Sequence, residues 1–415
     1  MKALTVTSSN PLRVVPTSVW MLGFVSLFMD MGSGVVYSLL PLYLVTVLET
    51  DVLTIGLIEG AAEVISSGAK ALSGTLSDYW GQRKGLAVLG YGLSGFSKPL
   101  FALATSPAGV MAVYVGDRLG KGIRVAPRDA LIADATPPEQ RGAAYGLRQS
   151  LDTIGAVLGP LAASALMTAT AQDFQLVFKL TLIPGILAVG LLLFGVREPT
   201  EVGPRKRTNP FRWEALRSLG RGYWLLVGVA LLAGLGNSSN AFLLLRSQEL
   251  GISTALVPLT LVVMNIAYFL SAYPIGALSD RLGRVGILLS GFLLYSFVYL
   301  GFAFAQASWQ VWVLFALYGL YLGINKGVLS ALVTDLIPAD LRGTAFGILN
   351  LAVGIALFLA SFLAGSLWQK IGSEAAFVAG SLLTGISAIV LLIGKLLSLL
   401  EKQDPIEGER IEVDR

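Results

Sequence analysis

The sequence predicts an all-α membrane protein with 12 transmembrane helices in two pseudo-symmetric six-helix bundles. Three observations lead to this fold class. Of the 415 residues, 54% are hydrophobic and only 13% are charged, roughly half the charge of a soluble domain. Apolar runs of about 20 residues, the length that crosses a bilayer, recur along the chain. Two polar motifs are each present once in both halves of the sequence.

Short polar segments separate the apolar runs. They predict helices, in order, at 17–48, 52–78, 86–105, 108–133, 142–169, 174–196, 223–248, 255–279, 285–306, 309–336, 343–370 and 374–400. The first run is too long for the apolar region of a signal peptide. The one long polar connection is 197–222. We therefore expect an N-terminal bundle at 1–196, a cytoplasmic linker at 197–222, a C-terminal bundle at 223–400 and a cytoplasmic tail at 401–415.

The distribution of Lys and Arg predicts the orientation. If both termini are cytoplasmic, Lys and Arg in the connections all lie on the cytoplasmic side, apart from Lys370 at the end of the eleventh segment. Cytoplasmic loops carry an excess of these residues. The run Arg205-Lys206-Arg207 and the net charge of +4 are then orientation signals and not a nucleic-acid site. We expect a multi-pass protein of the cell (inner or plasma) membrane.

The two repeated motifs indicate that the chain is a duplicated six-helix unit. The segment 74–83, Gly-Thr-Leu-Ser-Asp-Tyr-Trp-Gly-Gln-Arg, recurs as Gly-Ala-Leu-Ser-Asp-Arg-Leu-Gly-Arg at 276–284, and 134–142 is matched by 335–343. Such duplication is a known transporter architecture. We expect the four loops to form a cytoplasmic gate that contains Gly74, Asp78, Arg83, Asp134, Arg141, Gly276, Asp280, Arg284, Asp335 and Arg342, with Gly74 and Gly276 permitting close helix approach.

The repeated G-x-L-S-D-x-x-G-x-R element resembles the signature of the major facilitator superfamily, and the resemblance covers essentially the whole chain. The segment Arg118-Leu-Gly-Lys121-Gly122 is similar to the R-x-x-Q-G motif of its drug/proton antiporters, with Lys in place of Gln. Gly155, Gly159 and Pro160 match the G-x-x-x-G-P antiporter motif, although Ala162-Ala163 replaces the usual Gly-Gly. The segment 120–134 resembles the corresponding segment of a bacterial and archaeal branch of this superfamily. The resemblance implies a 12-helix transporter that works by alternating access.

Charged residues of the N-terminal half fall on narrow helical stripes. At 100° per residue, Glu59, Glu63 and Lys70 share one face, as do Asp117, Lys121, Arg124 and Arg128 on the fourth helix. Ionisable side chains are costly inside a membrane span, so each is first considered as part of a functional site. We expect the proton-coupling residues to be among Asp30, Glu59, Glu63, Arg118 and Asp152. For Arg124, Arg128 and Asp129, structural ion pairs are the favoured interpretation.

The C-terminal half replaces these charges with neutral polar residues. The repeat maps Glu63 onto Asn265, Asp117 onto Tyr318 and Asp152 onto Val353. We expect the N-terminal half to titrate and the C-terminal half to donate neutral hydrogen bonds, unless its Asn and Tyr residues only join helices. The substrate-cavity candidates are Tyr37, Lys121, Arg148, Gln149, Asn237, Asn240, Asn265, Tyr318, Asn325 and Asn350.

The predicted function is proton-coupled export of a small organic molecule. No P-loop motif is present, so the energy comes from an ion gradient or from the substrate itself. The chain has no cysteine or histidine, so no Cys/His metal site is available, and no cofactor is expected. The expected partners are a small substrate, protons and the lipid bilayer, with no nucleic acid, and we expect a monomer.

Other functions remain open. Arg clusters suit an organic anion with phosphate or carboxylate groups. Some relatives of the branch that 120–134 resembles are associated with nickel resistance. Nickel favours imidazole ligands, and this chain has no histidine, so a divalent-metal exporter is less attractive. A membrane-embedded enzyme is disfavoured because Ser/His and Cys/His pairs are impossible here. A receptor is disfavoured because little chain remains for a signalling domain.

Overall fold

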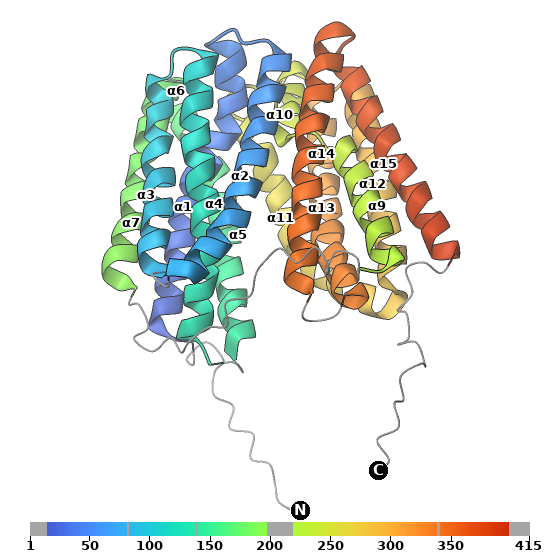
Figure 1. Ribbon diagram of the computed structural model, residues 1–415. Helices are drawn as coiled ribbons and strands as arrows, with labels where there is room; N and C mark the ends of the chain where they lie inside the picture. Colours follow the sequence, from blue (N-terminus) through green and yellow to red (C-terminus); the bar gives the residue numbers. More distant parts are fainter. Residues whose placement is uncertain (1–14, 81–82, 138–139, 197–218, 338–340, 398–415) are drawn as a thin grey trace, which may run out of the picture.

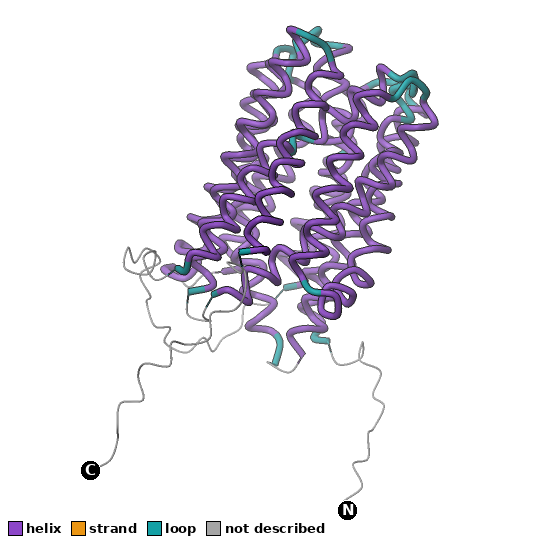
Figure 2. Tube along the Cα trace, turned by 90° about the vertical axis from the view of Figure 1, so that its right-hand side faces the viewer, coloured by secondary structure: helices purple, strands orange, loops and turns teal. Residues whose placement is uncertain are grey.

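The computed structural model describes residues 15–80, 83–137, 140–196, 219–337 and 341–397, and these residues form helices and connecting loops without a strand (Figures 1 and 2). The first half contains α1 (Thr17–Thr46), α2 (Val52–Trp80), α3 (Arg83–Leu100), a short 3-10 turn (Phe101–Leu103), α4 (Pro107–Ala135), α5 (Arg141–Ala169), α6 (Phe174–Leu180) and α7 (Leu182–Gly195). The second half contains α9 (Arg221–Gly236), α10 (Asn240–Glu249), α11 (Val257–Leu282), α12 (Arg284–Phe304), α13 (Ser308–Leu336), α14 (Arg342–Lys370) and α15 (Ser373–Leu396).

The all-α fold and its 12 spans are confirmed, and 2 spans are interrupted. The sixth span is divided at Thr181 into α6 and α7, and the seventh is unwound at Asn237–Ser239 between α9 and α10. Among the described residues, 11 spans are long and apolar enough to cross a membrane. The twelfth is α4, whose charged side chains, from Asp117 to Asp134, lower its hydropathy. The 197–222 linker lies mostly outside the described residues, as do the tail and the Arg205–Arg207 run.

Helices α1 to α7 pack against one another on one side of the molecule, and α9 to α15 pack on the other (Figure 1). Two helix pairs make most of the contact between the sides, α2 with α14 and α5 with α11, and α1 adds smaller contacts with α10 and α11. We call the end that contains Thr17 and Arg284 the inner end, and the end that contains Thr46 and Val257 the outer end. At the outer end, Asp51 accepts a 2.9 Å hydrogen bond from the Thr54 amide and caps α2. This bond and one from the Thr54 hydroxyl lower the pKa of Asp51.

The two halves touch from the outer end to about the middle of the spans. A Cβ at Gly56 of α2 would lie 2.3 Å from the Ser361 carbonyl oxygen of α14. A Cβ at Gly354 of α14, which lies deeper, would lie 3.0 Å from the Ser67 hydroxyl. One hydrophobic core runs through this region and includes Leu39 of the first half and Phe242 of the second. Backbone contact and a shared core therefore close the outer end.

The antiporter-like motif forms the contact between α1 and α5. A Cβ at Gly155 would lie 2.5 Å from the Leu27 carbonyl oxygen, and one at Gly159 would lie 2.7 Å from the Gly34 Cα. Larger residues do not fit such backbone-to-backbone contact, which is why small residues are enriched where membrane helices cross. The glycines of the motif therefore hold α1 against α5 beside the cavity described next.

Candidate functional site

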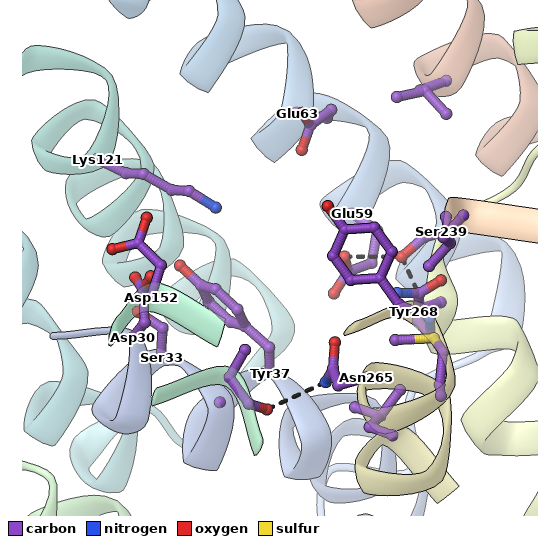
Figure 3. A pocket seen from close by; sticks show the side chains of 18 of the residues that line it. Asp30, Ser33, Tyr37, Glu59, Glu63, Lys121, Asp152, Ser239, Asn265 and Tyr268 are labelled. Carbon is purple, nitrogen blue, oxygen red and sulfur yellow. Dashed lines mark hydrogen bonds between the residues drawn. The ribbon is translucent and has the colours of Figure 1, made fainter. Parts of the chain in front are cut away.

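A cavity of about 760 Å³ lies between the two halves. Figure 3 shows Asp30, Tyr37, Lys121 and Asp152 on one side and Glu59, Glu63, Asn265 and Tyr268 on the other. The backbone contact between Gly56 of α2 and Ser361 of α14 lies on the outer side of this space, and the remaining α2–α14 and α5–α11 contacts flank it. Toward the inner end, the lining side chains Gln149 and Lys326 are exposed. The cavity therefore reaches the inner end and is covered at the outer end.

The cavity brings together most of the residues that the sequence singled out. All of the proton-coupling candidates line it: Asp30, Glu59, Glu63, Arg118 and Asp152. So do the following substrate-cavity candidates: Tyr37, Lys121, Gln149, Asn237, Asn240, Asn265 and Tyr318.

Three substrate-cavity candidates do not line the cavity, which corrects the expectation for them. Arg148 is tied to Asp152 at 3.0 Å and to Asp129 at 3.7 Å. Asn325 donates a 3.2 Å hydrogen bond to the Tyr321 hydroxyl one helical turn away. Asn350 is exposed elsewhere on α14. Helical periodicity gives the face of a helix, but not whether a side chain on that face bonds to a neighbour instead of entering the cavity.

Arg118 is held between two tyrosine rings on the first-half wall. Its guanidinium carbon lies 4.2 Å from the Tyr37 ring centroid and 4.7 Å from that of Tyr114. The guanidinium also donates to the Tyr114 hydroxyl and lies 4.0 Å from the Glu63 carboxylate. Cation–π contacts of this kind strengthen when they are removed from water. The charge of Arg118 is therefore fixed in position and directed toward the carboxylates of α2.

Glu59 connects the two halves at the interruption between α9 and α10. Its carboxylate accepts a 3.0 Å hydrogen bond from the Ser239 hydroxyl of the second half and a 3.2 Å bond from the Tyr114 hydroxyl of the first. Ser239 is also the N-cap of α10. A helix N-terminus carries partial positive charge that favours a carboxylate. The unwound segment thus offers this glutamate a dipole as well as a hydroxyl.

Two further carboxylates of the first half, Asp30 of α1 and Asp152 of α5, lie together across the cavity from Glu59 (Figure 3). Asp30 is 3.4 Å from the Arg124 guanidinium, and Asp152 is 3.0 Å from that of Arg148. The second oxygen of Asp152 is buried without a hydrogen-bond partner among the described residues. Arg124, for which a structural pair was expected, does pair, but it also lines the cavity.

Asp117 departs from the stripe on which the sequence placed it, because its side chain turns toward α3. The carboxylate is fully buried, pairs with Lys98 at 2.9 Å, and accepts hydrogen bonds from Ser94 at 2.6 Å and from Tyr37. Both charged partners are at most 1% exposed. This buried pair does not itself line the cavity, but Asp117 holds the hydroxyl of the cavity-lining Tyr37 by a hydrogen bond.

The second-half wall is neutral and aromatic, apart from Lys326. Tyr318 donates to the side-chain oxygens of Asn240 at 3.2 Å and Asn237 at 3.3 Å. Tyr295 donates to the Gly236 carbonyl at 2.9 Å and so satisfies backbone freed by the interruption. Asn265 donates to the Ala156 carbonyl of α5 at 3.0 Å, which adds a second polar bond between the halves.

The predicted gate residues pair within each half in this conformation. Arg83 binds the Ala130 carbonyl at 2.8 Å and also Asp134. Arg284 repeats this pattern with the Ala331 carbonyl at 2.6 Å and Asp335 at 2.5 Å, and it lies 3.4 Å from Asp280. These bonds connect the base of the third and fourth spans of each half. The spacing that the duplicated motifs share therefore has a structural role that the gate interpretation did not include.

Two further gate residues have described surroundings, Gly276 and Arg141. A Cβ at Gly276 would meet open space, so the close approach expected there is absent in this conformation. Arg141 is exposed. The side chains of Gly74, Asp78 and Arg342 lie outside the described residues.

Sequence reasoning missed several cavity residues. Tyr114 precedes Arg118 by one helical turn, and this i, i+4 spacing was the available signal. Ser239 and Tyr268 also line the cavity. The run Asn-Ser-Ser-Asn at 237–240 inside an apolar span signals an interruption, because Ser and Asn favour helix caps. Among the described residues, no three acidic side chains gather closely enough to hold a metal ion.

Comparisons with known proteins agree with this architecture. The model of the Major Facilitator Superfamily matches residues 22–246 and 225–412. An uncharacterized MFS-type transporter of Methanocaldococcus jannaschii is 34% identical over 386 residues, covering 92% of this chain and 95% of that protein. The multidrug resistance protein MdtH of Cronobacter sakazakii is 25% identical over 340 residues, covering 79% of this chain and 81% of that protein.

Among solved structures, a bacterial homolog of the human lysosomal transporter Spinster, in an inward-facing and occupied conformation, superposes with a TM-score of 0.76. It is 16% identical and covers 96% of this chain and 100% of that one, a likeness that concerns the fold alone. The chain has twelve spans and a central cavity between two bundles, and the family model matches nearly its whole length. The chain is a multi-pass membrane protein that belongs to the Major Facilitator Superfamily of transporters.

Proposed function

We propose that this transporter exports a small organic molecule in exchange for protons, by alternating access. The observation that carries the proposal is the cavity between the halves, into which Asp30, Glu59, Glu63 and Asp152 project. Ionisable residues within membrane spans mark ion and substrate pathways. The chain has no histidine, so these carboxylates are the candidates for the group that binds and releases the transported proton.

Glu59 supplies a physical link between proton binding and conformation. As a carboxylate it accepts from Ser239 and faces the N-terminus of α10, so its charge stabilises the contact between the halves. Protonation removes that charge and weakens the outer closure. By reciprocity, a state that is open at the outer end changes the proton affinity of Glu59. Proton binding and opening of the outer end are coupled through this one hydrogen bond.

Direction and orientation complete the proposal. The inner end faces the cytoplasm, with both termini there, because Lys and Arg of the connections gather on that side. The membrane is the cell inner (plasma) membrane, and the working unit is a monomer. Export is supported by the similarity to the multidrug resistance protein MdtH and by the antiporter-like Gly155, Gly159 and Pro160.

The test is flux into proteoliposomes under an imposed pH gradient. Three labelled probes that share one ring and differ in charge are suitable: benzenesulfonate (anionic), benzenesulfonamide (neutral) and phenyltrimethylammonium (cationic). We expect at least one to accumulate against its own gradient and to stop when an ionophore dissipates the pH gradient. Glu59→Gln should lose accumulation, whereas Glu49→Gln, which alters an exposed carboxylate of the α1–α2 loop, should not. Flux that is indifferent to the pH gradient contradicts proton coupling.

A further inference from the structure

The lysines of the membrane-spanning region divide into two kinds. Lys98 is 1% exposed and is paired with Asp117 at 2.9 Å. Lys70, Lys121 and Lys326 line the cavity, and none of them forms an ion pair with a described residue. An unpaired ammonium within a span is costly. The cavity therefore keeps a surplus of positive charge that its own carboxylates only partly neutralise.

The carboxylates of the cavity do not fully balance these lysines. Glu63 interacts electrostatically with all three, but its single negative charge is also shared with Arg118, and the other carboxylates have partners of their own. Asp30 lies 3.4 Å from Arg124, Glu63 lies 4.0 Å from Arg118, and Asp152 pairs with Arg148. Glu59 is occupied by hydroxyl donors and by the N-terminus of α10, so that helix end is not open to another anion. The lining holds six cationic side chains and four anionic ones: Lys70, Arg118, Lys121, Arg124, Arg128 and Lys326 against Asp30, Glu59, Glu63 and Asp152.

The unpaired lysines come from both halves and lie beside aromatic rings. Lys121 of α4 has its ammonium 5.8 Å from the Tyr37 ring centroid, and Lys326 of α13 has its own 5.0 Å from that of Tyr268. Both tyrosines line the cavity. The two walls thus each offer one ammonium and one ring, which suits a molecule with an anionic group attached to an organic body.

We propose that the cargo is an organic anion whose carboxylate, phosphate or sulfonate group binds between Lys121 and Lys326. The inference rests on the transport function proposed above and names the substrate class of the same cavity. An anion shared by two lysines from opposite halves attracts the halves toward each other. Cargo binding therefore favours a state in which the cavity is closed at both ends, since a ligand shifts the population toward the state that it binds better.

The test measures binding separately from transport. Thermal unfolding of the purified, full-length protein in detergent is followed with benzenesulfonate, benzenesulfonamide and phenyltrimethylammonium, which share a ring and differ in charge. We expect benzenesulfonate to stabilise the wild type at concentrations about tenfold lower than the other two, because hydrogen bonds to charged groups are the strong ones. Lys121→Gln and Lys326→Gln should each remove that preference. Lys326→Arg should retain it, as should Lys370→Gln at an exposed lysine outside the cavity.

Each outcome bears on the proposal. Preference for the cation, equal binding of the three probes, no binding, or an anion preference that survives both lysine-to-glutamine changes overturns it. Failure of the transport proposal is distinguishable. Lysine-dependent anion binding without flux driven by a pH gradient retains the substrate class and rejects the coupling, whereas lysine-independent export of a neutral or cationic probe does the reverse.

Discussion

The repeat places Ser94, Lys98 and Asp117 of the first half where the second half has Tyr295, Tyr299 and Tyr318. In the first half these residues form a buried ion pair with a hydroxyl partner. In the second half they form a tyrosine cluster, with ring centroids 4.2 Å apart for Tyr295 and Tyr299 and 6.0 Å apart for Tyr295 and Tyr318. Corresponding helices are thus joined by charge in one half and by ring packing in the other.

This difference extends to the cavity walls and indicates how the two halves divide their tasks. In the first half, charged groups are placed in fixed positions by Tyr37, Tyr114 and the Lys98–Asp117 pair. The second half provides a rigid aromatic and amide surface, with Lys326 as its charge at the cavity. Changes at Arg118 and at the carboxylates of the first half should therefore affect coupling, and changes in the second half should affect affinity.

The largest expected effect comes from the cavity carboxylates. We expect at least one of Asp30→Asn, Glu59→Gln, Glu63→Gln and Asp152→Asn to abolish accumulation of a transported probe under a pH gradient, because the proton then has no binding group. Glu374→Gln, which alters an exposed carboxylate of the second half outside the cavity, should leave accumulation gradient-driven. Proteoliposome flux measures both. If all four neutralised variants still concentrate the probe, the carboxylates are not the coupling groups.

Arg118→Lys should lower transport about thirtyfold. A point ammonium cannot contact two tyrosine rings and reach Glu63 as a planar guanidinium does, and a desolvated cation–π contact is worth about 2 kcal/mol. Initial rates at subsaturating probe are the measurement. Arg246→Lys, on the second half outside the cavity, is the control for arginine replacement in general. Wild-type rates for Arg118→Lys would reduce this arginine to a structural charge.

Tyr318→Phe should weaken probe affinity roughly two- to tenfold and leave the pH dependence of flux unchanged. The change removes one hydroxyl proton, which Asn237 and Asn240 share, and such a hydrogen bond is worth about 1 kcal/mol. Affinity is measured by titration in detergent and coupling by flux. A loss of coupling in this variant would show that the second half takes part in proton transfer, and the division between the halves would fail.

Helix number, span positions and the cavity-facing side of most helices followed from hydropathy and the 100° periodicity, because both depend on local sequence. Two kinds of feature did not. The turn of Asp117 toward Lys98 depends on which neighbouring helix offers a partner, and the pairing of Arg83 with Asp134 depends on how α3 meets α4. The Glu59–Ser239 bond joins residues 180 positions apart, so no local pattern predicts it.

The smallest expected effect concerns the repeated loops. If Asp78 stabilises a state closed at the inner end by a charge–dipole contact, Asp78→Asn should shift the equilibrium between inner-open and inner-closed states about two- to fivefold, since such contacts are typically worth 0.3–1 kcal/mol. Single cysteines at Gln149 and Asn350, equivalent and exposed positions of the two halves, report the opening by their labelling rates. Thr136 and Ile337 are unsuitable reporters, because each is only 3% exposed in the open state.

Slower or unchanged labelling at both reporters in Asp78→Asn would assign the repeated loop to folding alone. Asp280→Asn is the matched variant in the second half. Its carboxylate already has a partner in Arg284 of the same half, so a smaller shift is expected.

The glycine contact between α1 and α5 has a mechanical consequence. Since Gly155 and Gly159 bring the two backbones together without intervening side chains, neither helix can roll or slide independently of the other. Helix α5 touches the second half at α11, where Asn265 binds the Ala156 carbonyl, and α1 carries Asp30. Ala156 follows Gly155, where an added Cβ would lie 3.2 Å from the Asp30 Cβ. Movement of α11 at this contact is therefore passed through α5 and α1 to the carboxylate. The exposure of Asp30 to water should change in the same stroke that moves the halves apart.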